Sequence, residues 1–263
     1  MKTKDLSNQI AATYKMLRIG IAVLAFAFPL LLWLGGCLLA DLPLAGSMSE
    51  YYHASSSIHP GEGAPGQGVM RNEFVGILFA IGAILFIYQG YTRFEDWALN
   101  LAGILAWGIA LFPMTWSTGP GDSSFSLHGT CAISFFVCIA YVCICRASDT
   151  LKLIHDDVLR QRYHRTYIYL GIAMVAFPAL AFFLISRLPA HKSAIFFVEL
   201  AGIYVFGTYW VVKSHEVSKT DSDQKAAMGK LRVEPHGLSA SLRPLSITSA
   251  DDPTQTHKGD HGR

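Results

Sequence analysis

Charged residues are scarce in this chain, and long apolar runs take their place. Of its 263 residues, 15% are charged and 52% are hydrophobic, whereas about a quarter of the residues in a soluble globular domain are charged. The formal net charge is only +2, and no basic stripe with interleaved aromatic residues occurs. The composition therefore excludes an ordinary soluble domain and predicts no nucleic-acid partner.

Three further features are missing. None of the five cysteines lies in a predicted loop, so a disulfide framework is not expected. The first apolar run is too long for a cleaved signal peptide and lacks a small-residue cleavage site, so we expect it to stay as a signal anchor. No N-x-S/T sequon occurs, so glycosylation gives no information about orientation.

The apolar runs have the length of membrane spans. A helix needs about 20 apolar residues to cross about 30 Å of hydrocarbon, and the alternating pattern of barrel strands is absent. We therefore predict an all-α fold, a polytopic six-transmembrane-helix bundle. The predicted spans cover residues 18–40, 73–92, 96–116, 127–146, 166–187 and 193–213.

The distribution of Lys and Arg predicts the orientation. Eighteen of them flank the ends of the spans on the side of the two termini, and three flank the opposite ends. Positive charge marks the cytoplasmic side, so residues 1–17 and 214–263 are predicted to be cytoplasmic and the loop 41–72 to face outward. The second terminal segment is polar, Pro-containing and without apolar periodicity, and is predicted to be disordered. Short loops and an outer face without sequons favour a bacterial inner membrane.

Small residues recur at helical spacing and predict how the middle spans pack. The second predicted span carries Glu73, Gly76, Ala80 and Ala83 on one stripe. A corresponding stripe of the third span consists of Gly103, Ala106, Ala110 and Pro113. Because small residues let membrane helices approach closely, these stripes predict a tight hairpin of the two spans.

Polar residues gather at the predicted outer face. Glu73 opens the second span and His128 opens the fourth, while Glu199 lies about 9 Å below the outer end of the sixth. An ionisable group below the membrane surface is costly and is by default a functional-site hypothesis. The outer loop adds further members to this group, which are Tyr51, Tyr52, His53 and Arg71.

Three uses of this group stay open. It locks the bundle or contacts a lipid headgroup or another membrane protein, through Arg71, Glu73, Glu199, Tyr51 and Tyr52. Alternatively, His53 and His128 help to bind a metal, with zinc as the candidate, although no cofactor is otherwise predicted. In the third use, His128 works with Glu73 or Glu199 in acid–base catalysis. The first use, a non-enzymatic membrane protein, is favoured.

Four motifs carry a resemblance to a known group of proteins. They are SMSEYYH at 47–53, RNEFVG at 71–76, Leu111-Phe112-Pro113 near the end of the third span, and His128-Gly129. Together with the six-span layout, they resemble an uncharacterised family of bacterial membrane proteins whose layout is similar to the DRAM and GPI-lipid-remodelling Frag superfamily. The resemblance covers about residues 15–215. It implies membrane residence and lipid handling, and it supplies no catalytic residues.

A second resemblance concerns Ser49 and His53, four residues apart. This pair is similar to the Ser/His pair of the ceramidase and adiponectin-receptor-like membrane hydrolases, which bind zinc. Those families also have an intramembrane Asp and a His-x-x-x-His pair on the last span, and the predicted last span here has no such pair. A metal-dependent hydrolase acting on a lipid is therefore the alternative function.

Overall fold

The computed structural model describes residues 3–53, 68–112, 126–187, 192–233 and 247–249. Most of these residues are helical, which confirms the prediction of a helical protein. The long helices are α1 (Thr3–Ala40), α2 (Arg71–Ile87), α3 (Arg93–Leu111), α4 (Leu127–Tyr141), α5 (Asp157–Arg187) and α6 (Lys192–Thr220). The short elements are η1 (Met48–Tyr52), η2 (Val142–Arg146), η3 (Asp149–Leu153), α7 (Ser222–Ala227), β1 (Leu231–Val233) and β2 (Ile247–Ser249).

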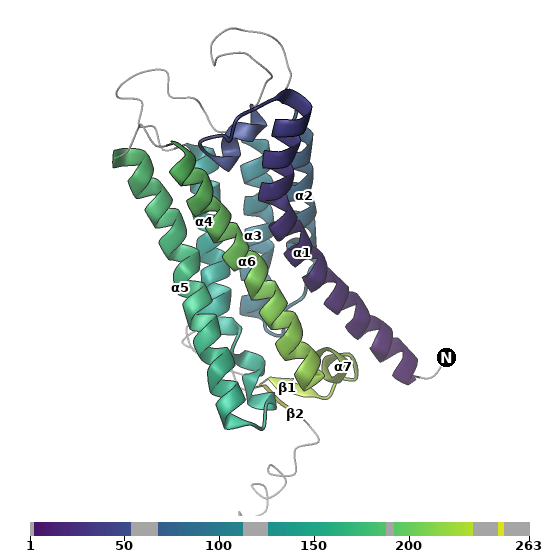
Figure 1. Cartoon of the computed structure of the whole chain (residues 1–263). Coiled ribbons are helices and arrows are strands. Elements are labelled where there is room, and N and C mark those ends of the chain that lie inside the picture. Colours follow the sequence, from purple (N-terminus) through teal and green to yellow (C-terminus); the bar gives the residue numbers. More distant parts are fainter. Residues whose placement is uncertain (1–2, 54–67, 113–125, 188–191, 234–246, 250–263) are drawn as a thin grey trace, which may run out of the picture.

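The long helices form a closed ring in chain order. Each of α1 to α6 packs against the next, and α6 returns to pack against α1. Figure 1 shows α6 between α5 and α1, with η1 at one end of the bundle and α7 at the other. We call these the η1 end and the α7 end. Because α1 to α6 alternate in direction, the starts of α2, α4 and α6 lie at the η1 end.

Side-chain caps decide where two of these helices begin. The hydroxyl of Thr92 accepts the backbone N–H of Glu95 at the start of α3, and the Ser126 hydroxyl accepts that of Gly129 at the start of α4. Such residues satisfy N–H groups that have no partner within the helix. The second cap fixes the first turn of α4, which carries His128.

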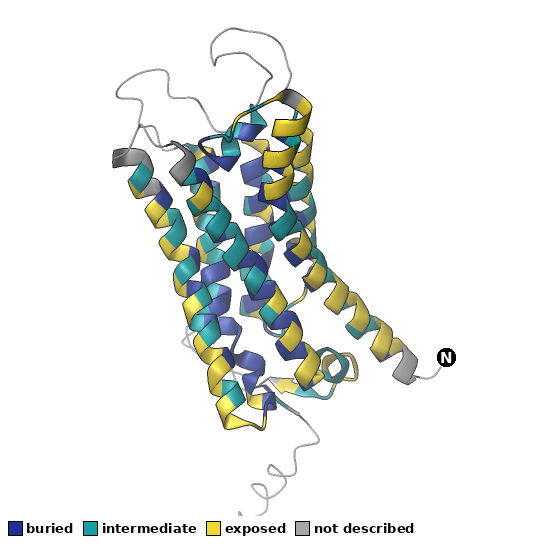
Figure 2. Cartoon of the chain, viewed as in Figure 1, coloured by how far each residue is buried: buried dark blue, intermediate teal, exposed yellow. Residues whose placement is uncertain are grey.

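Apolar side chains cover the outside of the bundle as well as its core. Large exposed hydrophobic residues occur on each of α1 to α6, for example Leu38, Phe86, Trp97, Val137, Ile172 and Phe197, and Figure 2 shows the exposed residues along the outward faces. A soluble monomer rarely exposes so much apolar surface. Three helical segments of the described chain are long and apolar enough to cross a membrane, namely Leu6–Leu39, Leu127–Leu153 and Ile195–Thr220. The chain is therefore compatible with a membrane protein.

A close contact between glycines joins α2 to α3, but through a face of α2 that the sequence did not predict. A Cβ on Gly103 would lie 2.6 Å from the carbonyl oxygen of Gly82, and one on Gly82 would lie 2.8 Å from that of Gly103. The predicted stripe of α3 is buried at Gly103, Ala106 and Ala110. The predicted stripe of α2 was wrong, because Gly76 is exposed and Gly82 lies on the buried face.

Both terminal segments contain more regular structure than the sequence predicted. The first helix begins at Thr3, so most of residues 1–17 continues the first predicted span. At the other end, α6 runs to Thr220 and is followed by α7 and by the antiparallel pair β1–β2, where disorder was predicted from residue 214. The amide of Gln224 on α7 donates to the side chain of Asn8 on α1 at 3.1 Å. Contact between the two segments therefore stabilises both.

Candidate functional site

The η1 end is closed by the short helix η1, which four long helices hold in place. η1 packs against α1, α2 and α6, and a side chain of η1 reaches α4. The side chain of Tyr51, a residue of η1, is completely buried, and its hydroxyl accepts the backbone N–H of Ala45 at 3.3 Å. A backbone bond from Phe196 to the Gly46 carbonyl, at 2.9 Å, fixes the preceding loop on α6.

Glu199 is the main polar anchor of η1. Its carboxylate accepts the backbone N–H of Met48 at 2.7 Å and lies 2.9 and 3.0 Å from the hydroxyl of Ser47. Ser47 is also the N-cap of η1, because its hydroxyl accepts the N–H of Ser49. The carboxylate of Glu199 thus satisfies donors at the start of η1, where negative charge is favourable.

His128 holds the same short helix from the other side. Its Nε2 lies 2.7 Å from the hydroxyl of Ser49, and its Nδ1 lies 2.9 Å from the carbonyl oxygen of Phe112 and 3.1 Å from that of Ile109. The imidazole is 6% exposed and stacks against Phe74, with ring centres 6.5 Å apart. His128 therefore links η1, α3 and α4 in one hydrogen-bonded group.

Arg71 lies at the start of α2, beside the end of η1. Its Nε donates to the carbonyl of Tyr52 at 3.1 Å, and its guanidinium lies over the Tyr52 ring, 4.8 Å from the ring centre. Gly68 makes this approach possible, because a Cβ there would lie 2.9 Å from both the Arg71 Nε and the Tyr52 carbonyl oxygen. Within the described ranges, no carboxylate forms an ion pair with Arg71.

The structure distributes the other predicted site residues differently. Glu73 is exposed on the first turn of α2, and no hydrogen bond or ion pair joins it to His128 or Glu199. Tyr51 faces the core, so it does not reach a lipid or partner as the sequence predicted. His53 is partly buried, with its ring centre 5.0 Å from that of Tyr52.

The described residues offer no ligand set for zinc. Among them, no three His, Cys, Asp or Glu side chains lie close enough together to hold a metal ion. His128 already uses both ring nitrogens in hydrogen bonds. A metal site that combines His53 and His128 therefore does not fit the described residues.

The α7 end contains a buried ionic network that was not predicted from the sequence. The Lys213 ammonium lies 2.9 Å from the Glu216 carboxylate and donates to the hydroxyl of Thr150 at 2.8 Å. Glu216 also accepts hydrogen bonds from Thr150 at 2.9 Å and from the Tyr167 hydroxyl at 3.2 Å. The spacing of Lys213 and Glu216 is the only signal in the sequence, since residues three apart share a helix face.

A second ion pair lies at the same end. Arg18 of α1 is completely buried and forms a salt bridge with Asp223 of α7. The hydroxyl of Tyr88 accepts from Arg18 at 3.0 Å, and that of Tyr91 donates to Asp223 at 2.6 Å. The network joins α1, α2 and α7 through hydrogen bonds and the ion pair that these four side chains make with one another. We therefore interpret it as a structural lock, and the candidate functional site is the group of residues at the η1 end.

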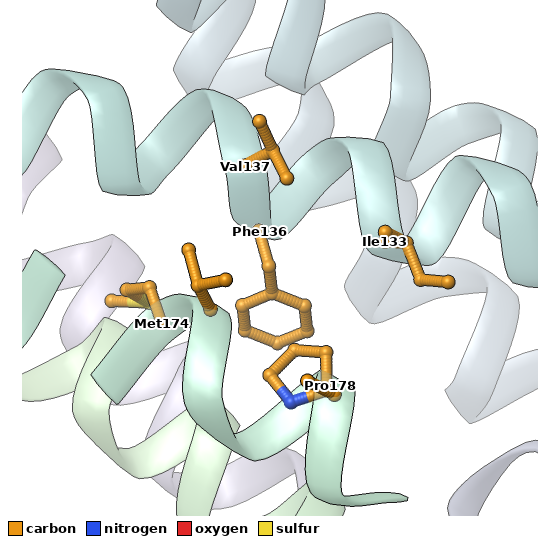
Figure 3. A pocket seen from close by; sticks show the side chains of 7 residues that line it. Ile133, Phe136, Val137, Met174 and Pro178 are labelled. Carbon is orange, nitrogen blue, oxygen red and sulfur yellow. The ribbon is translucent and has the colours of Figure 1, made fainter. Parts of the chain in front are cut away.

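An apolar pocket of about 200 Å³ lies between α4 and α5. Figure 3 shows Phe136 of α4 pointing toward Pro178 of α5, with Met174 beside them. Its lining consists of Ile133, Phe136, Val137, Met174, Val175, Pro178 and Ala179. Because no polar side chain lines it, the pocket offers no group for chemistry and suits only an apolar occupant.

Comparison of the chain with protein-family models, curated protein sequences and solved structures finds no match. The function must therefore be argued from the site itself.

Proposed function

We propose that this chain is a six-span protein of a bacterial inner membrane that binds the phosphate of an anionic lipid headgroup at its η1 end. In this arrangement both termini are cytoplasmic, and the η1 end faces outward. The exposed apolar residues on all six helices support the number of spans. The eighteen Lys and Arg residues on the side of the termini support the orientation.

The observation that carries this proposal is the arrangement of Arg71. Its guanidinium is held by the Tyr52 carbonyl and the Tyr52 ring, while its two terminal nitrogens have no partner among the described residues. Arginine is suited to phosphate because its planar fork presents paired donors. The contacts with Tyr52 fix the side chain in advance, so less conformational freedom is lost when a phosphate binds.

The position of Arg71 favours a lipid over a soluble phosphate. It opens α2 at the boundary between the apolar helix and the polar loop, which is where lipid headgroups lie. The similarity of its layout to that of the DRAM and GPI-lipid-remodelling Frag superfamily supports the same ligand class. Another membrane protein is the alternative partner at this face.

The test compares lipid binding by the detergent-purified wild type with that of Arg71→Ala, Arg71→Lys and Arg93→Ala. Arg93 is an exposed arginine at the start of α3, at the α7 end, and serves as the matched control. We expect phosphatidylglycerol to bind more tightly than diacylglycerol, which lacks the phosphate. Arg71→Ala should weaken phosphatidylglycerol binding about tenfold or more, because a hydrogen bond to a charged group contributes about 1.5–3 kcal/mol.

Two further variants test whether the paired donors of Arg71 are what binds the phosphate. Arg71→Lys should retain part of the affinity, since it keeps the charge but loses the paired donors, and Arg93→Ala should bind like the wild type. Equal binding of phosphatidylglycerol and diacylglycerol would contradict the proposal. Glycerol phosphate binding as tightly as the lipid would replace the lipid by a soluble phosphate. Loss of a copurifying membrane protein, with lipid binding unchanged, would favour the alternative partner.

A further inference from the structure

The hydrogen bonds around His128 define its protonation pattern. A carbonyl oxygen can only accept, so the Nδ1 that faces the carbonyls of Phe112 and Ile109 must carry a proton. In the neutral ring, Nε2 is then an acceptor. The hydroxyl of Ser49, 2.7 Å away, therefore donates its proton toward Nε2 of His128.

This arrangement has the geometry of an activated serine. A nucleophilic hydroxyl is activated by a base within about 2.6–3.2 Å, provided that a third group orients the base. Here the Phe112 carbonyl at 2.9 Å supplies the orienting contact, in the place where a carboxylate stands in a Ser-His-Asp triad. His128 is shielded, with 6% of its surface exposed, whereas Ser49 is partly exposed. The base is thus protected while the nucleophile can be reached.

The surrounding structure holds both partners firmly. Ser49 lies on η1, which Glu199 anchors through Ser47 and Met48. His128 lies in the first turn of α4, which is capped by Ser126. A site held by rigid elements and by hydrogen-bonded supporting residues is what precise catalytic geometry requires.

We propose that Ser49 and His128 form a nucleophile–base pair that cleaves or transfers a carboxylic ester of a membrane lipid. The substrate class rests on the lipid binding proposed above, since Arg71 holds the carbonyl of Tyr52, three residues after Ser49. A phosphate at Arg71 would place the glycerol esters of the same lipid at the depth of η1.

The reaction needs only the ester lipid and an acceptor, which is water or the hydroxyl of a second lipid. Ser49 Oγ forms a bond to the ester carbonyl carbon, and its proton passes to Nε2 of His128. The bond from that carbon to the leaving alcohol oxygen then breaks, and His128 returns the proton to this oxygen. Water, or the hydroxyl of a second lipid, attacks the acyl-Ser49 in the same way and gives a fatty acid or a new ester.

The experiment uses the full-length protein in lipid nanodiscs with a fluorophosphonate probe. In that reaction Ser49 Oγ bonds to phosphorus, fluoride leaves, and the proton passes to His128. We expect labelling of the wild type at the peptide that contains Ser49. Ser49→Ala should abolish the labelling, and His128→Gln should slow it about a hundredfold, which is typical for loss of a general base.

Ser148 provides a matched control, because its hydroxyl lies 2.9 Å from a ring nitrogen of His164 near the α7 end. Ser148→Ala should label like the wild type.

Labelling that persists in Ser49→Ala would overturn the proposal. So would a wild type that does not label while a known serine hydrolase in the same nanodiscs does. The melting temperature of each variant is recorded, and the rate of labelling is compared only between variants that melt like the wild type. Ser49→Thr, which keeps the hydroxyl, replaces Ser49→Ala if the latter is unfolded, and is expected to label more slowly than the wild type.

Two measurements separate this proposal from the lipid-binding proposal. Ser49→Ala should bind phosphatidylglycerol like the wild type, whereas Arg71→Ala should lose the lipid but still react with the probe, which has no headgroup. Fatty acid released from phosphatidylglycerol nanodiscs should require both residues. Lipid binding without labelling would overturn the nucleophile–base pair alone. Labelling without binding of the anionic lipid would overturn the lipid substrate.

Discussion

Lys213 and Glu216, one turn apart on α6, form an ion pair that the bundle shields from solvent. The Nζ and Oε2 atoms lie 2.9 Å apart, and at most 1% of either side chain is exposed. The hydroxyls of Thr150 and Tyr167 donate to the Glu216 carboxylate, and the Thr150 hydroxyl also accepts from the Lys213 ammonium. Such a pair tolerates the loss of both charges better than the loss of one.

We therefore predict that Glu216→Gln destabilises the protein by about 3–5 kcal/mol, because it leaves the Lys213 ammonium buried without a counter-charge. Equilibrium unfolding in detergent measures this. The double variant Lys213→Met/Glu216→Met should lie closer to the wild type than Glu216→Gln does. Arg160→Gln breaks the exposed pair with Asp157 and should cost less than about 1 kcal/mol. Equal losses for Arg160→Gln and Glu216→Gln would contradict the burial argument.

The contact of Gly82 with Gly103 predicts a second effect on stability. Gly103→Ala should cost about 1–3 kcal/mol, because the new methyl group would lie 2.6 Å from the Gly82 carbonyl oxygen and would push α2 away from α3. Gly76→Ala on the same hairpin meets open space and should not destabilise. The melting temperatures of the two variants test the prediction. A lower melting temperature for Gly76→Ala than for Gly103→Ala would show that α2 and α3 do not make their close contact at Gly82 and Gly103.

Glu199 is predicted to hold η1 in place and thereby to fix the position of Ser49. Glu199→Gln should lose about 1–3 kcal/mol of stability, since an amide replaces a carboxylate that accepts from Met48 and Ser47. Hydrogen exchange at the Met48 amide should become faster in this variant. Glu73→Gln, at an exposed position, should change the stability by less than about 0.5 kcal/mol. If the Met48 amide exchanges equally fast in both variants, Glu199 does not anchor η1.

Labelling of single cysteines in intact cells tests the orientation. Asn72 and Asp157 are both exposed, at the η1 end and near the α7 end respectively. In a background without the five native cysteines, Asn72→Cys should react with a membrane-impermeant maleimide before lysis, and Asp157→Cys only after lysis. The reverse result would invert the proposed orientation. Labelling of both before lysis would contradict the three proposed crossings by α2, α3 and α4, because an odd number of crossings places the two positions on opposite sides of the membrane.

The sequence predicted the small-residue face of α3 but not that of α2. In α3, Gly103, Ala106 and Ala110 follow helical spacing and are buried. In α2, Gly76 and Ala83 of the predicted stripe are exposed and Ala80 is half-buried, whereas the contact uses Gly82. Both faces of a membrane helix are apolar, so hydrophobicity does not distinguish the buried side from the lipid side.

The composition and the apolar runs alone determined that this is a helical protein with segments suited to a membrane, because the length of such a run follows directly from the thickness of the bilayer. The tertiary structure decided which polar residues meet. Ser49 and His128 lie 79 positions apart and Ser47 and Glu199 lie 152 apart, so only the packing of η1 between α4 and α6 brings them together. Hydrogen bonds at about 3 Å depend on that packing, and no local pattern in the chain encodes it.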